Sequence, residues 1–159
     1  MNVTRFTDYA LRVLIYLGVN DQNLVTIKDV ATSYDISKNH LMKVVQELSA
    51  QGYVEATRGK NGGIKLSRSA DQINIGELVR KFEQQSVLIE CFGESNQCVI
   101  TPACQLKEIF AGALEHFFIY LEQYTLADLI KHPHSKQLIQ IFISSIQNKS
   151  SSFGLDNSC

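Results

Sequence analysis

The sequence predicts a mainly α-helical protein with a small β-hairpin wing, built as a winged helix-turn-helix head followed by a long dimerisation helix. Three features of the sequence support this fold class. Two segments of helical periodicity meet at a tight turn, a basic Asn-Gly hairpin follows them directly, and a long apolar helical pattern comes after the hairpin. A chain of 159 residues suffices for one ordinary domain, or for a small domain with an added arm.

Composition restricts the class of protein. Hydrophobic residues make up 45% of the chain, which is enough for a core without disulfides. The chain begins with a polar segment and contains no run of about 18 apolar residues, so we expect neither a signal peptide nor a membrane span. We therefore expect a cytoplasmic protein, in which thiols stay reduced and clustered cysteines bind metal or carry out redox chemistry more often than they form disulfides.

The charge is unevenly distributed along the chain. Residues 1–70 carry nine Lys and Arg against six Asp and Glu, and residues 71–159 carry six against ten, which gives +3 and −4. This asymmetry is typical of a protein with a nucleic-acid-facing front, although ordinary surface variation would also produce it.

A first amphipathic helix is expected from Thr4 to about Asn20, because apolar residues recur there at helical spacing. Thr4 is a plausible N-cap for this helix. Asp8 lies in its early turns, where a carboxylate complements the positive end of the helix dipole.

The next residues predict a helix-turn-helix. Thr26 and Asp29 form a capping-box pattern that starts a short helix. Ser37 is then expected to cap a second helix, which continues to about Ala50 and ends at Gly52. A short helix, a tight turn and a capped second helix are the parts of this DNA-binding motif.

The start of the second helix is the expected site of base contact, because in this motif its N-terminal residues reach into the major groove. The predicted contacts are Ser37, Lys38, Asn39, His40 and, one turn further on, Lys43. Asn can bind adenine and Lys can bind guanine, and both can also hold phosphates. Solvation alone would also place polar residues at an exposed helix start, so the motif by itself does not decide for DNA.

A basic hairpin follows the helix-turn-helix directly. Residues 53–57 and 64–67 alternate like two strands, and the Asn-Gly pair between them is a strong hairpin signal, because both residue types tolerate positive φ. Arg58, Lys60 and Asn61 lie at its tip, where positive side chains are favoured at phosphates or in the minor groove. A hairpin with this position and charge predicts a DNA-contacting wing.

A further helix begins near Asn74, and a long helical pattern begins after Cys104. The apolar seam of the long pattern consists of Leu106, Phe110, Ala113, Phe117, Leu121 and Tyr124, widened by Ile109, Leu114 and Phe118. This seam is too apolar to remain exposed on a lone helix, and a protein that binds inverted repeats needs two-fold symmetry, so we expect a homodimer. A short helical piece from Thr125, a last amphipathic helix over residues 138–146 and a mobile tail from Lys149 complete the chain.

We divide the chain into four parts. They are a DNA-binding domain over residues 1–85, a cysteine loop over residues 86–105, a dimerisation helix over residues 106–130, and a C-terminal helix with its tail over residues 131–159. The sequence contains no internal repeat, and it assigns no role to the last part.

The cysteine loop contains three of the four cysteines, Cys91, Cys98 and Cys104, separated by six and then five residues. Loops of about 12 to 15 residues without secondary structure are usually functional or disordered, and three thiols suggest that a group bound to sulfur holds this loop in shape. The spacing lacks the C-x2-4-C pair of a zinc site, and a disulfide switch would leave one thiol over. An iron–sulfur cluster, zinc, a thiol switch and incidental thiols all remain open from the spacing.

The sequence resembles the family of iron–sulfur winged-helix transcription regulators, and within it the nitric-oxide-sensitive repressors. The resemblance covers about residues 1–130. It is carried by RFTDYALR at residues 5–12, GKNGG at 59–63, ECF at 90–92, CVITPAC at 98–104 and TLADL at 125–129. The cysteine motif together with the wing is specific, whereas either alone would not be.

The resemblance implies a dimeric repressor with a 4Fe–4S cluster held by Cys91, Cys98 and Cys104. One branch of this family has a fourth ligand in a His three residues after the last cysteine, but this sequence has Lys107 there, and an ammonium group cannot ligate. This departure favours the nitric-oxide branch, in which the resemblance suggests a carboxylate from the partner's first helix, corresponding to Asp8. Competing fourth ligands are Cys159, His116 and Glu90.

The predicted function is a nitric-oxide-sensing transcriptional repressor that binds double-stranded operator DNA as a homodimer and is released when nitric oxide nitrosylates its cluster. Two other functions compete with it: a thiol- or zinc-based redox-sensing DNA-binding regulator, and a small iron–sulfur electron carrier. The carrier would need none of the predicted DNA contacts, and the cluster-free regulator would be colourless and free of iron. A catalytic role has little support, because neither a nucleotide-binding loop nor a Ser/His/Asp signature occurs.

Overall fold

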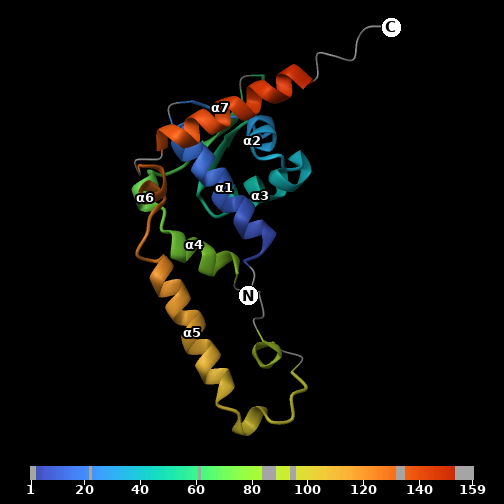
Figure 1. The fold of residues 1–159 in the computed structure, drawn as a ribbon, viewed down its shortest axis with the longest axis vertical. Helices are drawn as coiled ribbons and strands as arrows, with labels where there is room; N and C mark the ends of the chain where they lie inside the picture. Colours follow the sequence, from blue (N-terminus) through green and yellow to red (C-terminus); the bar gives the residue numbers. More distant parts are fainter. Residues whose placement is uncertain are drawn as a thin grey trace, which may run out of the picture. The chain divides into compact units, whose positions relative to one another are not determined.

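The structure, a computed structural model, describes residues 3–21, 23–60, 62–83, 89–93, 96–131 and 135–152 (Figure 1). The described chain is mainly helical with one two-stranded antiparallel sheet, which confirms the predicted fold class. It forms two compact units, each described by itself below. The cysteine unit consists of Met1–Asp8 and Asn74–Tyr124, and the helix-turn-helix unit consists of Tyr9–Ile73 and Thr125–Cys159.

The helix-turn-helix consists of α2 (Ile27–Tyr34) and α3 (Lys38–Ala50), and α1 (Arg5–Val19) precedes it. From Tyr9 onward α1 belongs to the same unit as these two helices. The large side chains that are fully buried in this unit are Val13, Leu14, Leu17, Val30, Leu41, Val44, Leu48, Ile73 and Leu126. Most of them lie on α1 and α3 at the three- and four-residue steps of an amphipathic helix, so the core follows the apolar periodicity of the sequence.

Local hydrogen bonds define the helix-turn-helix boundaries. The Thr26 hydroxyl accepts from the Asp29 N–H at 3.2 Å and the Asp29 carboxylate accepts from the Thr26 N–H at 3.0 Å, which confirms the capping box. α2 ends where Asp35 adopts a left-handed conformation with φ of 56°. Ser37 occupies the N-cap position of α3, but its side chain makes no capping hydrogen bond, so the expected cap is wrong. Ile36, directly before it, is buried.

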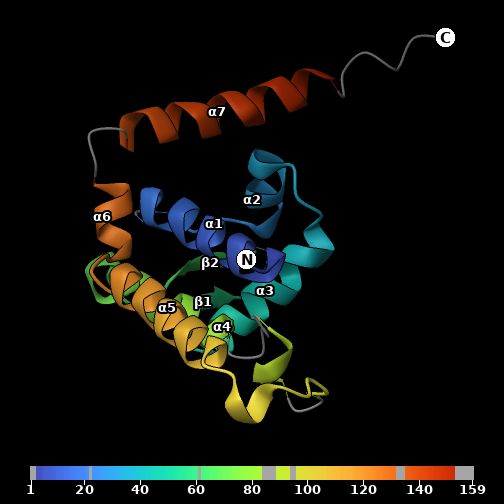
Figure 2. The ribbon, with the colours of Figure 1, turned by 60° about the horizontal axis from the view of Figure 1, so that its bottom comes forward.

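The wing follows α3, which Gly52 ends with φ of 74°. β1 (Val54–Thr57) pairs with β2 (Gly63–Leu66) as an antiparallel hairpin, and Figure 2 shows β1 beside α3. An additional bridge joins Val25 to Ile64, whose N–H donates to the Val25 carbonyl at 2.7 Å. This bridge attaches the wing to the segment that leads into α2.

The tip of the wing needs glycine at two positions. Gly59 has φ of 113°, a conformation that a residue with a Cβ rarely adopts. At Gly62 an added Cβ would lie 2.9 Å from the carbonyl carbon of Arg58, so the backbone passes too closely for a side chain. The Asn-Gly pair predicted the hairpin because both residue types tolerate positive φ, and within the described tip positive φ occurs at Gly59. Asn61 lies outside the described residues.

The cysteine unit contains α4 (Ile75–Phe82) and the long helix α5 (Leu106–Leu121) (Figure 1). Asn74 caps α4 as the sequence predicts, because its side chain accepts from a backbone N–H of the first turn at 3.0 Å. α5 ends at Leu121, three residues before Tyr124, to which the apolar seam was expected to continue. The Tyr124 carbonyl instead accepts from the Ile75 N–H at 2.9 Å and so joins the end of the unit to the start of α4.

Arg80 joins α4 to α5. Its guanidinium donates to the Glu115 carboxylate at 2.7 and 2.8 Å and to the Glu122 carboxylate at 3.0 Å. It also lies over the ring of Phe118, 4.6 Å from the ring centroid. The hydrogen bonds from Arg80 hold the pKa of Glu115 below its ordinary value. These contacts fix which face of α5 turns towards α4.

The helix-turn-helix unit is completed by α6 (Leu126–Ile130) and the 3-10 helix η1 (Ala70–Gln72). α6 begins at a second capping box, formed by Thr125 and Asp128. Hydrogen bonds from the Thr125 N–H and hydroxyl hold the pKa of Asp128 below its ordinary value. A short helix of this kind depends on such caps because most of its backbone groups lie at its ends.

The last helix, α7 (Ser135–Ser152), confirms the predicted C-terminal amphipathic helix. It continues past Lys149, where we expected a mobile tail to begin, because no glycine or proline interrupts the sequence before Gly154. His132 and His134 lie outside the described residues. No helix in the described part of the chain is long and apolar enough to cross a membrane.

Gly76 allows close approach between α4 and the end of α5. An added Cβ would lie 2.7 Å from the Cα of Glu122, so we expect Gly76→Ala to lower the free energy of unfolding by about 1–3 kcal/mol. Gly112→Ala on α5 is the matched control, since its Cβ would meet no atom within 4 Å, and it should raise stability by roughly 0.5–1 kcal/mol. Thermal unfolding followed by circular dichroism measures both, and shifts of the same sign would contradict this account.

Candidate DNA-binding surface and cluster site

One face of α3 is buried and the opposite face is exposed, which leaves the predicted base contacts accessible. The buried side chains are Leu41, Val44, Val45 and Leu48. Ser37, Lys38, Asn39, His40 and Lys43 are all exposed at the start of the helix. The ring of His40 also lies beside that of Tyr9 on α1, with 6.5 Å between centroids, so this contact limits the orientations of His40.

The four predicted cationic contacts of α3 and of the wing are not neutralised within the described chain. No carboxylate of the described residues pairs with any of four predicted contacts, Lys38, Lys43, Arg58 and Lys60. Lys65 on the wing differs from them, because it lies 3.3 Å from the Glu55 carboxylate of the neighbouring strand. Unpaired exposed cations are the groups that neutralise phosphates when DNA binds.

A groove of about 710 Å³ lies between α3, the wing and the start of α2. Its described lining contains three cations, Lys28, Lys38 and Arg58, and no carboxylate, and Met42 and Gln46 also contribute to it. The sequence reasoning missed Lys28, Met42 and Gln46 as lining residues. Lys28 lies in the first helix of the motif, which crosses the DNA backbone in proteins of this kind, and that rule would have found it.

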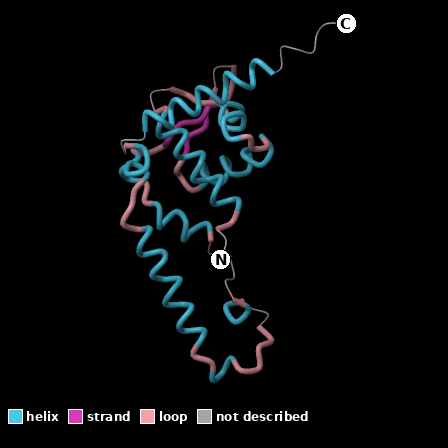
Figure 3. Tube along the Cα trace, in the orientation of Figure 1, coloured by secondary structure: helices cyan, strands magenta, loops and turns pink. Residues whose placement is uncertain are grey.

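The three cysteines lie along the loop between α4 and α5, drawn as loop and short helical turns in Figure 3. Cys91 is half-buried in the 3-10 helix η2 (Glu90–Phe92), Cys98 is exposed, and Cys104 is half-buried directly after η3 (Thr101–Ala103). All three are free thiols. Thiolates are the usual ligands of iron–sulfur clusters, so the chemistry of this donor set fits such a group.

Hydrogen bonds order the second half of the loop. The Asn96 side chain donates to the Thr101 hydroxyl at 2.9 Å and accepts from the Cys98 N–H at 3.0 Å. The Thr101 hydroxyl donates to the Cys98 carbonyl at 2.8 Å. The Gln97 N–H donates to the Glu90 carboxylate at 2.9 Å. The loop therefore has internal support in addition to any group bound at sulfur.

The described part of one chain brings together no group of three or more His, Cys, Asp or Glu side chains that could hold a metal ion. Asp8 and the three cysteines belong to the same unit but do not form such a group. The ligands of a cluster bind different iron atoms, so they are spaced more widely than the ligands of a single zinc ion. The thiols thus fit a cluster by their chemistry.

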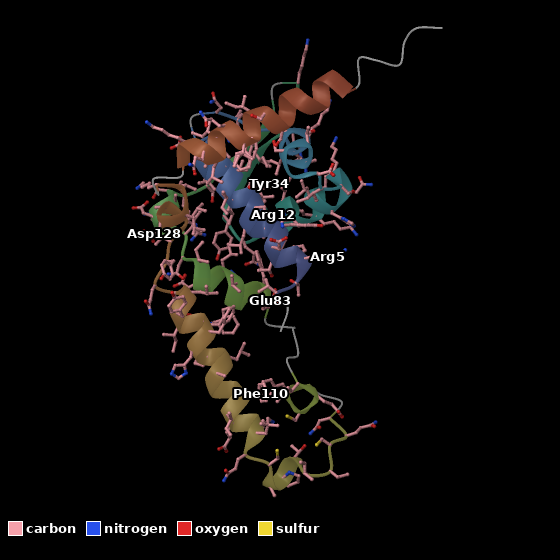
Figure 4. All side chains as sticks on the ribbon, in the orientation of Figure 1. Arg5, Arg12, Tyr34, Glu83, Phe110 and Asp128 are labelled. Carbon is pink, nitrogen blue, oxygen red and sulfur yellow. The ribbon has the colours of Figure 1, made fainter. Side chains whose placement is uncertain are left out.

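The turn that carries Asp8 is held by Glu83, the residue directly after α4 (Figure 4). The Glu83 carboxylate accepts from the Thr4 N–H at 3.0 Å, from the Thr4 hydroxyl at 2.8 Å and from the Thr7 hydroxyl. The Thr4 hydroxyl accepts in turn from the Thr7 N–H at 3.3 Å, which confirms Thr4 as the N-cap of α1. Thr7 is fully buried and Asp8 is half-buried.

The other candidate ligands have different surroundings. Nδ1 of His116 lies 2.8 Å from the Gly112 carbonyl, so one ring nitrogen is engaged within α5. Glu90 accepts the hydrogen bond from Gln97 described above. Cys159 lies outside the described residues. Neither His116 nor Glu90, the two rivals that the structure describes, forms with the thiols a group that could hold a metal ion.

An exposed recognition helix and a cationic wing on a winged helix-turn-helix define a DNA-binding protein. Comparison with protein families gives the particular family. Residues 3–132 match Rrf2, described as an iron-dependent transcriptional regulator. The chain belongs to the Rrf2 family.

Relatives with high sequence identity agree with this assignment. The HTH-type transcriptional regulator NsrR of Bacillus licheniformis is 51% identical over 142 residues, which cover 87% of this chain and 99% of the relative. NsrR of Oceanobacillus iheyensis is 53% identical, covering 83% of this chain and 91% of the relative, and NsrR of Bacillus subtilis is 48% identical, covering 83% and 92%. The resemblance seen in the sequence is thereby confirmed, and the chain is a transcriptional regulator and not an enzyme.

Solved structures share the fold at lower identity. IscR of T. potens has a TM-score of 0.68 at 21% identity, covering 86% of this chain and 91% of that chain. CymR of B. subtilis, a global cysteine regulator, has a TM-score of 0.65 at 24% identity, covering 83% and 98%. These likenesses support the winged-helix architecture described above.

The hydrogen bond from the buried Thr7 hydroxyl to Glu83 generates a prediction. We expect Thr7→Val to lower the free energy of unfolding by about 1–3 kcal/mol, because the part-buried Glu83 carboxylate would lose the donor that the buried Thr7 supplies. Thr7→Ser keeps the hydroxyl and should retain most of the stability. Urea unfolding of both variants measures the effect, and a Val variant as stable as the parent would show that this bond contributes nothing.

Proposed function

We propose that this protein is a nitric-oxide-sensing transcriptional repressor that binds operator DNA as a homodimer and carries an iron–sulfur cluster of the 4Fe–4S type. The observation that carries the proposal is the presence in one chain of an exposed cationic recognition helix and a loop with three free thiols. The relatives named NsrR and the iron-dependent description of the family support it. Because its operator is chromosomal DNA, we infer that it acts in the cytoplasm.

In the proposed complex, α3 enters the major groove and the wing contacts the adjacent backbone or minor groove. Base contacts come from Ser37, Lys38, Asn39, His40 and Lys43, and wing contacts from Arg58, Lys60 and Asn61. The groove between α3 and the wing accepts a phosphate strand, and Lys28 adds a cation to it. The lack of a carboxylate in the described lining supports this assignment, because DNA would meet no repulsion there.

The surface of α5 supports the homodimer. Leu106, Ile109 and Tyr120 are 51%, 64% and 59% exposed, and their spacing places them with Ala113 on one face of the helix. Phe118, which the predicted seam included, is instead buried within its own unit under Arg80. An exposed apolar stripe of this kind on a long helix suits a symmetric helix pair, and two-fold symmetry matches an inverted-repeat operator.

The proposed cluster ligands are the thiolates of Cys91, Cys98 and Cys104 and the carboxylate of Asp8 of the partner subunit. When bound, the cluster supplies iron atoms with which nitric oxide reacts. An oxygen ligand is weaker than a thiolate at such iron, so the Asp8 bond is the first that the chain would lose.

Loss of the Asp8 bond would connect sensing to DNA binding through α1. The first turn of this helix carries Asp8, and from Tyr9 onward the same helix forms part of the helix-turn-helix core. A coupling of about 3 kcal/mol between the two sites would change operator affinity about 150-fold.

The DNA-binding surface is tested by its salt dependence. We expect Lys43→Ala and Arg58→Ala each to weaken binding to operator DNA recovered by in vitro selection, and each to reduce the slope of log affinity against log salt by about 0.9. Lys65→Ala is the control on the same wing, because Lys65 is already paired with Glu55 and should leave the slope nearly unchanged. Fluorescence anisotropy titrations at several salt concentrations measure the slopes. Parent-like slopes for both test variants would remove α3 and the wing as the DNA surface.

The dimer and the partner origin of Asp8 are tested together by a mixed dimer. One chain carries Asp8→Ala, and the other carries Cys91→Ser, Cys98→Ser and Cys104→Ser, with different tags for anaerobic purification. If Asp8 ligates across the dimer, one complete site remains, with thiols from the first chain and Asp8 from the second. The mixed dimer should then hold half the parent's iron and sulfide, with the parent's absorbance and its response to nitric oxide.

The outcomes of the mixed dimer separate the alternatives. A spectrum like that of the Asp8→Ala homodimer would reject Asp8 as the partner's ligand, and an altered spectrum in Cys159→Ala would assign the ligand to Cys159. A parent protein that is colourless and free of iron, yet binds the operator, would reject the cluster and favour a thiol- or zinc-based regulator. Failure to form any mixed dimer would contradict the proposed homodimer.

A further inference from the structure

α7 lies beyond residue 132, where the family match ends, and yet it packs on the DNA-binding motif. Both ribbon views show α7 beside the helix-turn-helix, and its contacts are made chiefly with α2 (Figures 1 and 2). α2 has only eight residues and is too short to be stable without tertiary packing. The helix that covers α2 therefore affects the geometry of the helix-turn-helix.

Phe142 anchors α7 to this unit. Its side chain is 6% exposed, whereas its neighbours Ile141 and Ile143 on the same helix are 57% and 50% exposed. The Phe142 ring centroid lies 4.9 Å from that of Tyr16 on α1 and 5.3 Å from that of Tyr34 on α2. The two tyrosine rings lie 6.3 Å apart, so the three rings form a closed cluster.

Tyr34 connects this cluster to the turn of the helix-turn-helix. It is the last residue of α2 and directly precedes Asp35, whose left-handed conformation redirects the chain towards α3. The guanidinium of Arg12 lies 5.7 Å from the Tyr34 ring centroid, and Figure 4 shows both residues beneath α7. Tyr34 is thus held by α1 through Arg12 and by α7 through Phe142.

We propose that Phe142 is a positioning residue for operator binding, which fixes the end of α2 and thereby the turn that orients α3. The proposal rests on the proposed DNA-binding surface. Two residues, Asp35 and Ile36, separate α2 from the Ser37 that precedes α3, so a displacement of Tyr34 is transmitted to the start of the recognition helix. Ring contacts near 5 Å have preferred orientations, which allows Phe142 to fix the direction of Tyr34 as well as to cover it.

The test compares full-length variants at a temperature where all are folded. Phe142→Ala should weaken operator binding about tenfold, because it removes two aromatic contacts from the turn. It should also increase hydrogen exchange of the amides at the end of α2 in the absence of DNA. Ile141→Ala, an exposed position on the same helix, is the matched control and should leave both measurements unchanged. If the Ala variant does not fold, Phe142→Leu replaces it. This variant keeps most of the apolar volume, and it should weaken binding and increase exchange by smaller amounts than those expected for Ala.

Each outcome decides the proposal. Weaker binding together with faster exchange at the end of α2 supports it. A Phe142 variant with a lower melting temperature but the parent's operator affinity would overturn it, since Phe142 would then only stabilise the fold. Unchanged exchange at α2 would overturn it as well, and this readout requires no DNA. If Lys43→Ala and Arg58→Ala both keep the parent's salt slope while the exchange result holds, the proposed DNA-binding surface fails and the structural coupling of Phe142 to α2 stands.

Discussion

Hydrogen bonds to the Glu83 carboxylate fix the first turn of α1, and both proposed activities depend on this helix. Thr7 is fully buried, so water does not compete with Glu83 and the Thr4 hydroxyl for its hydroxyl group. Asp8 follows directly, and its place is therefore set by this part-buried network. From Tyr9 onward, α1 buries apolar side chains in the helix-turn-helix core. One continuous helix thus carries the proposed fourth ligand and a large part of the core that supports the recognition helix.

The DNA-binding surface depends on a separation of apolar and charged faces. α3 buries its apolar face, and this leaves its cations exposed without carboxylate partners in the described chain. The bridge between Val25 and Ile64 holds the wing against the segment before α2. Lys28 and Arg58 consequently line the same groove, although 30 residues separate them in the sequence. Positive charge from three elements is thereby collected where a phosphate strand would lie.

The cysteine loop combines internal order with free sulfur atoms. Asn96 and Thr101 hold its second half through side-chain and backbone hydrogen bonds, and none of these bonds uses a thiol. The three thiols therefore remain available as soft ligands. In the proposed site the weaker oxygen ligand belongs to the other subunit, so a change in ligation acts first on the contact between subunits. A site made only of thiolates from one chain would lack this connection.

The sequence by itself determined the fold class, the α1–α3 helices, the wing, and the residue types of the candidate site, because periodicity, capping and side-chain chemistry are local properties. A local rule failed at Ser37, which occupies the cap position without making the capping hydrogen bond. Only the tertiary structure decided the pairing of Thr7 with Glu83, 76 residues away, and the packing of Phe142 on the helix-turn-helix. Contacts between distant segments leave no periodic pattern, since either residue alone is compatible with many partners.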